Sequence, residues 1–103
     1  MDQIERITEM EGCLDASRHA ADALADALEE YKNTRQAFKK LSEYYGSSLW
    51  TEDYEADEAG LLPSGLKRGV LSEDAVYDLI TDNRELIAEM LKLSAEAVEK
   101  NLF

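Results

Sequence analysis

The chain has 103 residues, enough for one domain, and 23 Asp and Glu residues against 11 Lys and Arg give it a net charge of −12. This charge excludes an ordinary DNA- or RNA-binding surface, because phosphates would be repelled, and it disfavours an anionic membrane surface. No apolar run reaches the roughly 20 residues that span a bilayer, the acidic N-terminus resembles no signal or transit peptide, and the lone Cys13 excludes an internal disulfide, so we expect a cytoplasmic protein.

Glycine and proline divide the chain into a helix, a connector and a second helix. Residues 2–45 hold one glycine and no proline, whereas residues 46–71 hold four of the five glycines and the only proline. Residues 72–103 contain neither. We therefore predict a single all-α domain over residues 1–103, a long antiparallel helical hairpin with a packed connector that carries a short helix.

The first predicted helix spans about residues 2–45. Asp2 is a suitable N-cap, and Glu5 follows it three residues later, as in a capping box. Apolar residues then recur with a heptad period, which predicts a helix that packs along one seam. The seam consists of Ile7, Met10, Leu14, Ala21, Leu24, Leu28, Tyr31, Phe38 and Tyr45. Asn33 and Thr34 are weak helix formers, so a break there, giving a compact three-helix bundle, is the alternative fold.

The connector, residues 46–71, holds too much apolar material to stay solvated as a flexible linker. We predict a short helix at about residues 48–58 that ends before Gly60, since a serine or threonine can cap its start. The apolar residues of the connector are Leu49, Trp50, Tyr54, Leu61, Leu62, Leu66, Val70 and Leu71.

The last predicted helix spans about residues 72–102. Ser72 is a good N-cap, and acidic residues follow it in the first turn, where the helix dipole favours them. Leu71 and Val76 flank this cap at the spacing of a hydrophobic staple.

The block from Tyr44 to Leu79 reads YYGSSLWTEDYEADEAGLLPSGLKRGVLSEDAVYDL. It resembles the signature of a family of short, stand-alone bacterial proteins catalogued only as a domain of unknown function. The most specific parts are the tyrosine pair, Trp50 and the run from Leu66 to Ala75. The resemblance implies an all-helical fold and a bacterial cytoplasmic setting, and it implies no activity.

The aromatic and charged residues around the connector are the candidate binding site. They are Tyr44, Tyr45, Trp50, Asp53, Tyr54, Asp57, Lys67, Arg68 and Tyr77. Such a set can form a pocket or a partner surface with a polar rim, or the aromatic residues can simply form a small core. A concave pocket favours ligand binding, and a filled, flat surface favours an interaction protein; the residues expected to line the pocket are Tyr45, Trp50, Asp53, Tyr54 and Tyr77.

No residue set predicts a metal site, a cofactor or a catalytic centre. One acidic helical face projects away from the seam, which is typical of a solvated surface; it consists of Asp15, His19, Asp22 and Asp26. Asp53, Glu55 and Asp57 alternate as in a calcium loop, but Glu58 stands where that loop needs glycine. The sole histidine lies on the acidic face, so no Ser-His-Asp set is persuasive.

The leading functional hypothesis is a non-enzymatic protein-interaction or oligomerisation module that binds an unknown protein or a second copy of itself. The alternative is a ligand-binding protein or enzyme that uses the connector, and a third is an acidic mimic of nucleic acid. In a hairpin, the first turns extend beyond the last helix, so Ile4, Ile7 and Met10 are candidates for a homodimer seam. The alternative to a dimer is that the first helix begins later in the chain, or that a break folds it back.

Overall fold

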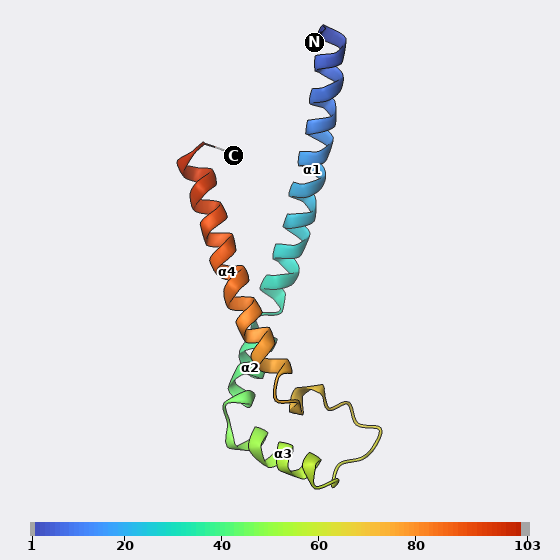
Figure 1. The fold of residues 1–103 in the computed structure, drawn as a ribbon, viewed down its shortest axis with the longest axis vertical. Helices are drawn as coiled ribbons and strands as arrows, with labels where there is room; N and C mark the ends of the chain where they lie inside the picture. Colours follow the sequence, from blue (N-terminus) through green and yellow to red (C-terminus); the bar gives the residue numbers. More distant parts are fainter. Residues whose placement is uncertain (1, 102–103) are drawn as a thin grey trace. The chain divides into compact units, whose positions relative to one another are not determined.

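The computed structural model describes residues 2–101, which form four α-helices and one short 3₁₀-helix without any β-strand. In chain order the elements are α1 (Gln3–Asn33), α2 (Arg35–Tyr45), α3 (Ser48–Glu58), η1 (Gly69–Leu71) and α4 (Ala75–Glu99) (Figure 1). The predicted all-α class is therefore confirmed, as is the order of a long helical stretch, a connector with a short helix, and a second long helix. Contacts divide the chain into two units, one that ends at Phe38 and one that begins at Lys39.

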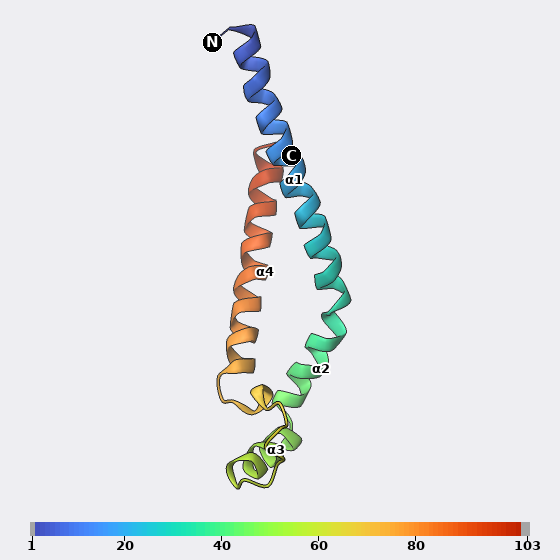
Figure 2. The ribbon, with the colours of Figure 1, turned by 90° about the vertical axis from the view of Figure 1, so that its right-hand side faces the viewer.

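Helix α1 runs without a break for 31 residues, as Figure 2 shows along its length. Asp2 is its N-cap as predicted: the Asp2 Oδ1 atom accepts the backbone N–H of Glu5 at 2.8 Å. None of the residues of α1 is buried. Its stability within the chain therefore depends on local hydrogen bonds and helix propensity.

The expectation of one continuous helix over residues 2–45 is wrong at Thr34, where the alternative placed a break. The Thr34 N–H bonds to the carbonyl oxygens of both Glu30 and Tyr31, at 3.1 and 3.2 Å, and the Thr34 hydroxyl donates to Tyr31 at 3.0 Å. Helix α2 then begins, and its Phe38 N–H donates to the Thr34 carbonyl at 3.0 Å. A threonine hydroxyl that bonds to the preceding turn competes with the regular helical ladder, which explains the interruption.

Helix α3 spans Ser48–Glu58, so the predicted short helix is confirmed. Ser47 caps its start, since the Ser47 side chain accepts the Trp50 N–H at 3.4 Å. Gly60 ends it in a left-handed conformation with φ of 69°, which glycine adopts without steric cost. The Leu61 N–H then bonds back to the Ala56 carbonyl at 3.0 Å, as in a Schellman motif.

The chain leaves α3 in an open loop and returns through η1 to the start of α4 (Figure 1). Ser72 was expected to begin the last helix, but α4 begins three residues later, at Ala75. The Ser72 Oγ atom accepts the Ala75 N–H at 3.1 Å, so this serine caps the turn before the helix. Leu71 and Val76, the two residues of the predicted staple, are buried with 6% and 3% of their surface exposed. They form the small core of the second unit, where η1 contacts both α3 and α4.

Helix α4 continues to Glu99, with Lys100 as its C-cap. The predicted end near residue 102 falls outside the described residues. Over residues 2–101, no helix combines the length and the apolar character needed to cross a bilayer.

Candidate functional site

Three aromatic residues, at the end of α2 and on α3, pack on one another and are called here the aromatic cluster: Tyr45, Trp50 and Tyr54. Trp50 and Tyr54 are four residues apart on α3 and thus share a face, where their rings stack at a centroid distance of 5.1 Å and an interplanar angle of 17°. The rings of Tyr45 and Trp50 meet edge to face, at a centroid distance of 5.3 Å and an interplanar angle of 73°. All three residues of the cluster are half-buried.

The polar atoms of the aromatic cluster all bond to the segment that leads into α4. The Trp50 Nε1–H donates to the Val70 carbonyl at 2.9 Å, which joins α3 to η1. The Tyr45 hydroxyl donates to the backbone carbonyl of Glu73 at 3.3 Å, and the Tyr54 hydroxyl donates to the side-chain carboxylate of Glu73 at 2.8 Å. The bond to Glu73, followed by desolvation, raises the pKa of Tyr54. The cluster therefore fastens α2 and α3 to the start of α4.

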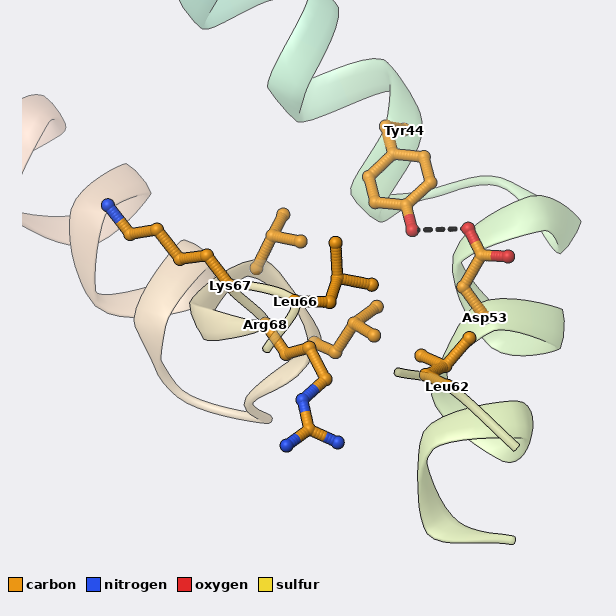
Figure 3. Close-up of a pocket in the computed structure, with 8 residues that line it drawn as sticks. Tyr44, Asp53, Leu62, Leu66, Lys67 and Arg68 are labelled. Atoms are coloured by element: carbon orange, nitrogen blue, oxygen red, sulfur yellow. Dashed lines mark hydrogen bonds between the residues drawn. The ribbon is translucent and has the colours of Figure 1, made fainter. Parts of the chain in front are cut away.

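A pocket of about 280 Å³ lies beside this cluster, between the end of α2, α3 and the segment around η1 (Figure 3). Its lining consists of Tyr44, Asp53, Leu62, Leu66, Lys67, Arg68, Val70 and Leu71. Half of these residues are aliphatic, and the volume is near the lower end of the range for small-molecule sites. Of the five residues predicted to line a connector pocket, only Asp53 lines this one.

Two residues that line the pocket, Tyr44 and Asp53, form a hydrogen bond with each other. The Tyr44 hydroxyl donates to Asp53 Oδ2 at 2.6 Å (Figure 3). This bond, with smaller contributions from desolvation and the negative charge of Asp53, raises the pKa of Tyr44 to about 12. Tyr44 therefore stays a neutral phenol near pH 7 and is poorly suited to act as a general base.

A salt bridge engages two more of the predicted site residues. Arg68 Nη1 lies 2.7 Å from Asp57 Oδ1, and both side chains are half-buried. Lys67 is exposed, and in Figure 3 its side chain extends away from Tyr44 and Asp53. Tyr77, on α4, is 61% exposed and does not belong to the aromatic cluster.

Residues 2–101 contain no group of three or more His, Cys, Asp or Glu side chains placed to hold a metal ion. Cys13 is a free, exposed thiol on α1.

The second candidate surface is on α1. Its large apolar residues at heptad spacing are called here the α1 seam: Ile7, Met10, Leu14, Leu24 and Leu28. Their side chains are between 39% and 60% exposed, and Ile4, beside the first of them, is 77% exposed. The three residues proposed for a dimer seam thus lie on an uncovered helix face.

A family model described as "Domain of unknown function (DUF4298)" matches residues 7–93. The chain belongs to the DUF4298 family. The match includes the α1 seam, the connector and most of α4, and it contains the whole Tyr44–Leu79 block in which the resemblance was recognised. No curated protein and no solved structure matches the chain.

Five residues of this DUF4298 chain belong to the candidate site but were not among the predicted site residues. Four of them line the pocket, and their only signal in the sequence was their place in the apolar connector; they are Leu62, Leu66, Val70 and Leu71. Glu73 accepts hydrogen bonds from Tyr45 and Tyr54, although its position alone indicated only a favourable charge near a helix start. No local pattern predicts these contacts, which cross 28 and 19 residues of chain.

Proposed function

We propose that this chain is a non-enzymatic protein-interaction module of the bacterial cytoplasm that binds a partner helix along the α1 seam. The observation that carries the proposal is that α1 buries none of its 31 residues yet exposes five large apolar side chains at heptad spacing. Complete burial of such a side chain is worth roughly 1.5–3 kcal/mol, so covering the remaining half of each gains about 1 kcal/mol. A docked helix would therefore gain several kcal/mol along this face.

The internal contacts of the connector support a structural role for it within this module. Asp53 and Asp57 are engaged by Tyr44 and Arg68, and the hydrogen bonds to Asp53 and Glu73 raise the pKa values of Tyr44 and Tyr54 above their ordinary value. Groups held in this way are poor candidates for proton transfer. The connector would then serve to hold α3 against the start of α4.

The test compares two substitutions on neighbouring positions of α1. Leu24→Asp places a carboxylate on the α1 seam, whereas Ala23→Asp places the same charge outside the seam. Helix content, measured by circular dichroism, identifies any variant that merely unfolds. We expect the wild-type chain and Ala23→Asp to capture the same proteins from a native lysate, and we expect Leu24→Asp not to capture them. Equal capture by all three chains would contradict binding through the seam.

A second candidate function is the binding of a small apolar ligand in the connector, and the pocket of about 280 Å³ with four aliphatic lining residues favours it. Addition of apolar fragments would then shift the amide resonances of Leu62, Leu66 and Val70. Leu66→Phe, which adds volume to the lining, should remove these shifts while preserving the wild-type helix content. Shifts that are absent, or that persist in Leu66→Phe, would contradict a site in this pocket.

A further inference from the structure

The charges of α1 are distributed unevenly around the α1 seam. When Ile7 takes position a of a heptad, Leu14 and Leu28 also occupy a, and Met10 and Leu24 occupy d. Positions e and g flank such a seam, and b, c and f face outward. Among the eight acidic residues of α1, Glu11 is the one at a flanking position. The outward positions hold the other seven, which are Glu5, Glu9, Asp15, Asp22, Asp26, Glu29 and Glu30.

The basic residues of α1 show the opposite distribution. Arg6 occupies g, and Arg18 and Lys32 occupy e, so all three cations flank the α1 seam. Apart from Ile4 and Glu11, the other flanking positions along the heptads hold small residues. These small residues are Cys13, Ala20, Ala25 and Ala27. Most of the negative charge of α1 is thereby kept away from its apolar face.

From this distribution we propose that the partner on the α1 seam is a second copy of this chain, with the two α1 helices parallel and in register. The inference rests on the proposed function, since it names the occupant of the same surface. In a parallel pair, position g of one helix faces position e of the following heptad in the other helix. Arg6 of each copy then faces Glu11 of the other, which gives two attractive pairs related by the two-fold axis.

The remaining flanking pairs of this arrangement bring no like charges together. Cys13 faces Arg18 of the second copy, and Ala27 faces its Lys32. Arg6 and Glu11 are exposed, and neither forms an ion pair within residues 2–101, so both are available to the second copy. Antiparallel pairing along the whole helix would instead separate Arg6 from the second copy's Glu11 by about 28 Å at a rise of 1.5 Å per residue.

Exchange of the two charges tests both the partner and the direction. Arg6→Glu alone places two carboxylates opposite each other in every pair, and Glu11→Arg alone places two cations there. Each single variant is expected to self-associate roughly tenfold more weakly than the wild type, because two attractive pairs become repulsive. A mixture of the two variants restores both attractive pairs, so the expected result is a mixed dimer of near wild-type affinity.

The measurement is sedimentation equilibrium of the full chain at micromolar to submillimolar concentration in 150 mM NaCl, with fluorescent labels of different colours for the mixture. Glu9→Arg is the matched control, since it makes the same charge change as Glu11→Arg at an outward position and should not weaken association. Circular dichroism verifies that each variant keeps its helix content.

The outcomes separate this inference from the proposed function. A wild-type chain that is monomeric throughout this range overturns pairing with a second copy, and the capture experiment with Leu24→Asp then decides whether another protein binds the seam. If Leu24→Asp disrupts the dimer but neither charge variant weakens it, the parallel register is overturned and self-association through the seam is retained. A dimer unchanged by Leu24→Asp overturns self-association through the seam, and unchanged capture overturns the proposed function.

Discussion

Trp50 is the residue whose replacement should most directly test how the connector is held together. Trp50→Leu removes the stacking on Tyr54, the edge contact with Tyr45 and the hydrogen bond to the Val70 carbonyl. Each aromatic pair is worth about 0.5–1.5 kcal/mol and the hydrogen bond about 1 kcal/mol. Because Trp50 is only half-buried, we expect Trp50→Leu to lower the free energy of unfolding by about 2–3 kcal/mol.

The assay is urea unfolding followed by circular dichroism at 222 nm, which, unlike indole fluorescence, can be measured in every variant. Trp50→Phe retains a ring but loses the bond to Val70, so its loss should be smaller, about 1 kcal/mol. Leu49→Ala is the control, since Leu49 precedes Trp50 on α3 and is 59% exposed; it should change stability by less than about 0.5 kcal/mol. A Trp50→Leu midpoint that equals that of Leu49→Ala would refute the assigned role of the aromatic cluster.

Three further predictions concern single contacts of the connector. Tyr44→Phe should lower stability at pH 8, because it removes the hydrogen bond to Asp53. The pKa of Tyr44 is about 12 in the folded chain and 10 ordinarily, so ionisation at high pH removes the stabilisation that this bond gives the wild type. The difference in stability between the variant and the wild type should therefore shrink between pH 10 and 12. Urea midpoints at each pH measure it, and a difference that stays constant to pH 12 would contradict the bond to Asp53. Gly60→Ala should cost about 1–2 kcal/mol in thermal unfolding because of its positive φ, whereas Gly65→Ala, which meets open space, should be near neutral. Arg68→Gln should cost about 0.2–1 kcal/mol at low salt and less in 1 M NaCl, and a loss independent of salt would argue against its ion pair.

Two of the helix ends were predictable because each depends on a few neighbouring residues. Asp2 caps α1 and Gly60 ends α3, as their side-chain chemistry and backbone freedom require. The break at Thr34 was visible only as an alternative, since helix propensity is a weak signal against a continuing heptad pattern. The structure resolves this competition through the hydroxyl bond of Thr34 to Tyr31.

The contacts of the candidate site were less predictable because they depend on the path of an irregular loop. The aromatic residues were identified by type, but their arrangement around Trp50 depends on the return of the chain to Val70 and Glu73. The same return brings Leu62 and Leu66 to Tyr44 and forms the pocket there. Tyr77, which is equally aromatic, was included by type alone and is exposed on α4.

The absence of buried residues in α1 has a consequence for the survival of the chain in a cell. A helix with no buried residue opens locally at a free energy set by its own hydrogen bonds, and each opening exposes its backbone to proteases. Arg6, Arg18 and Lys32 are cleavage sites for trypsin-like enzymes along this helix. A helix docked on the α1 seam, as proposed above, would also protect α1 from cutting, and the lifetime of the protein would then depend on how much of that partner is present.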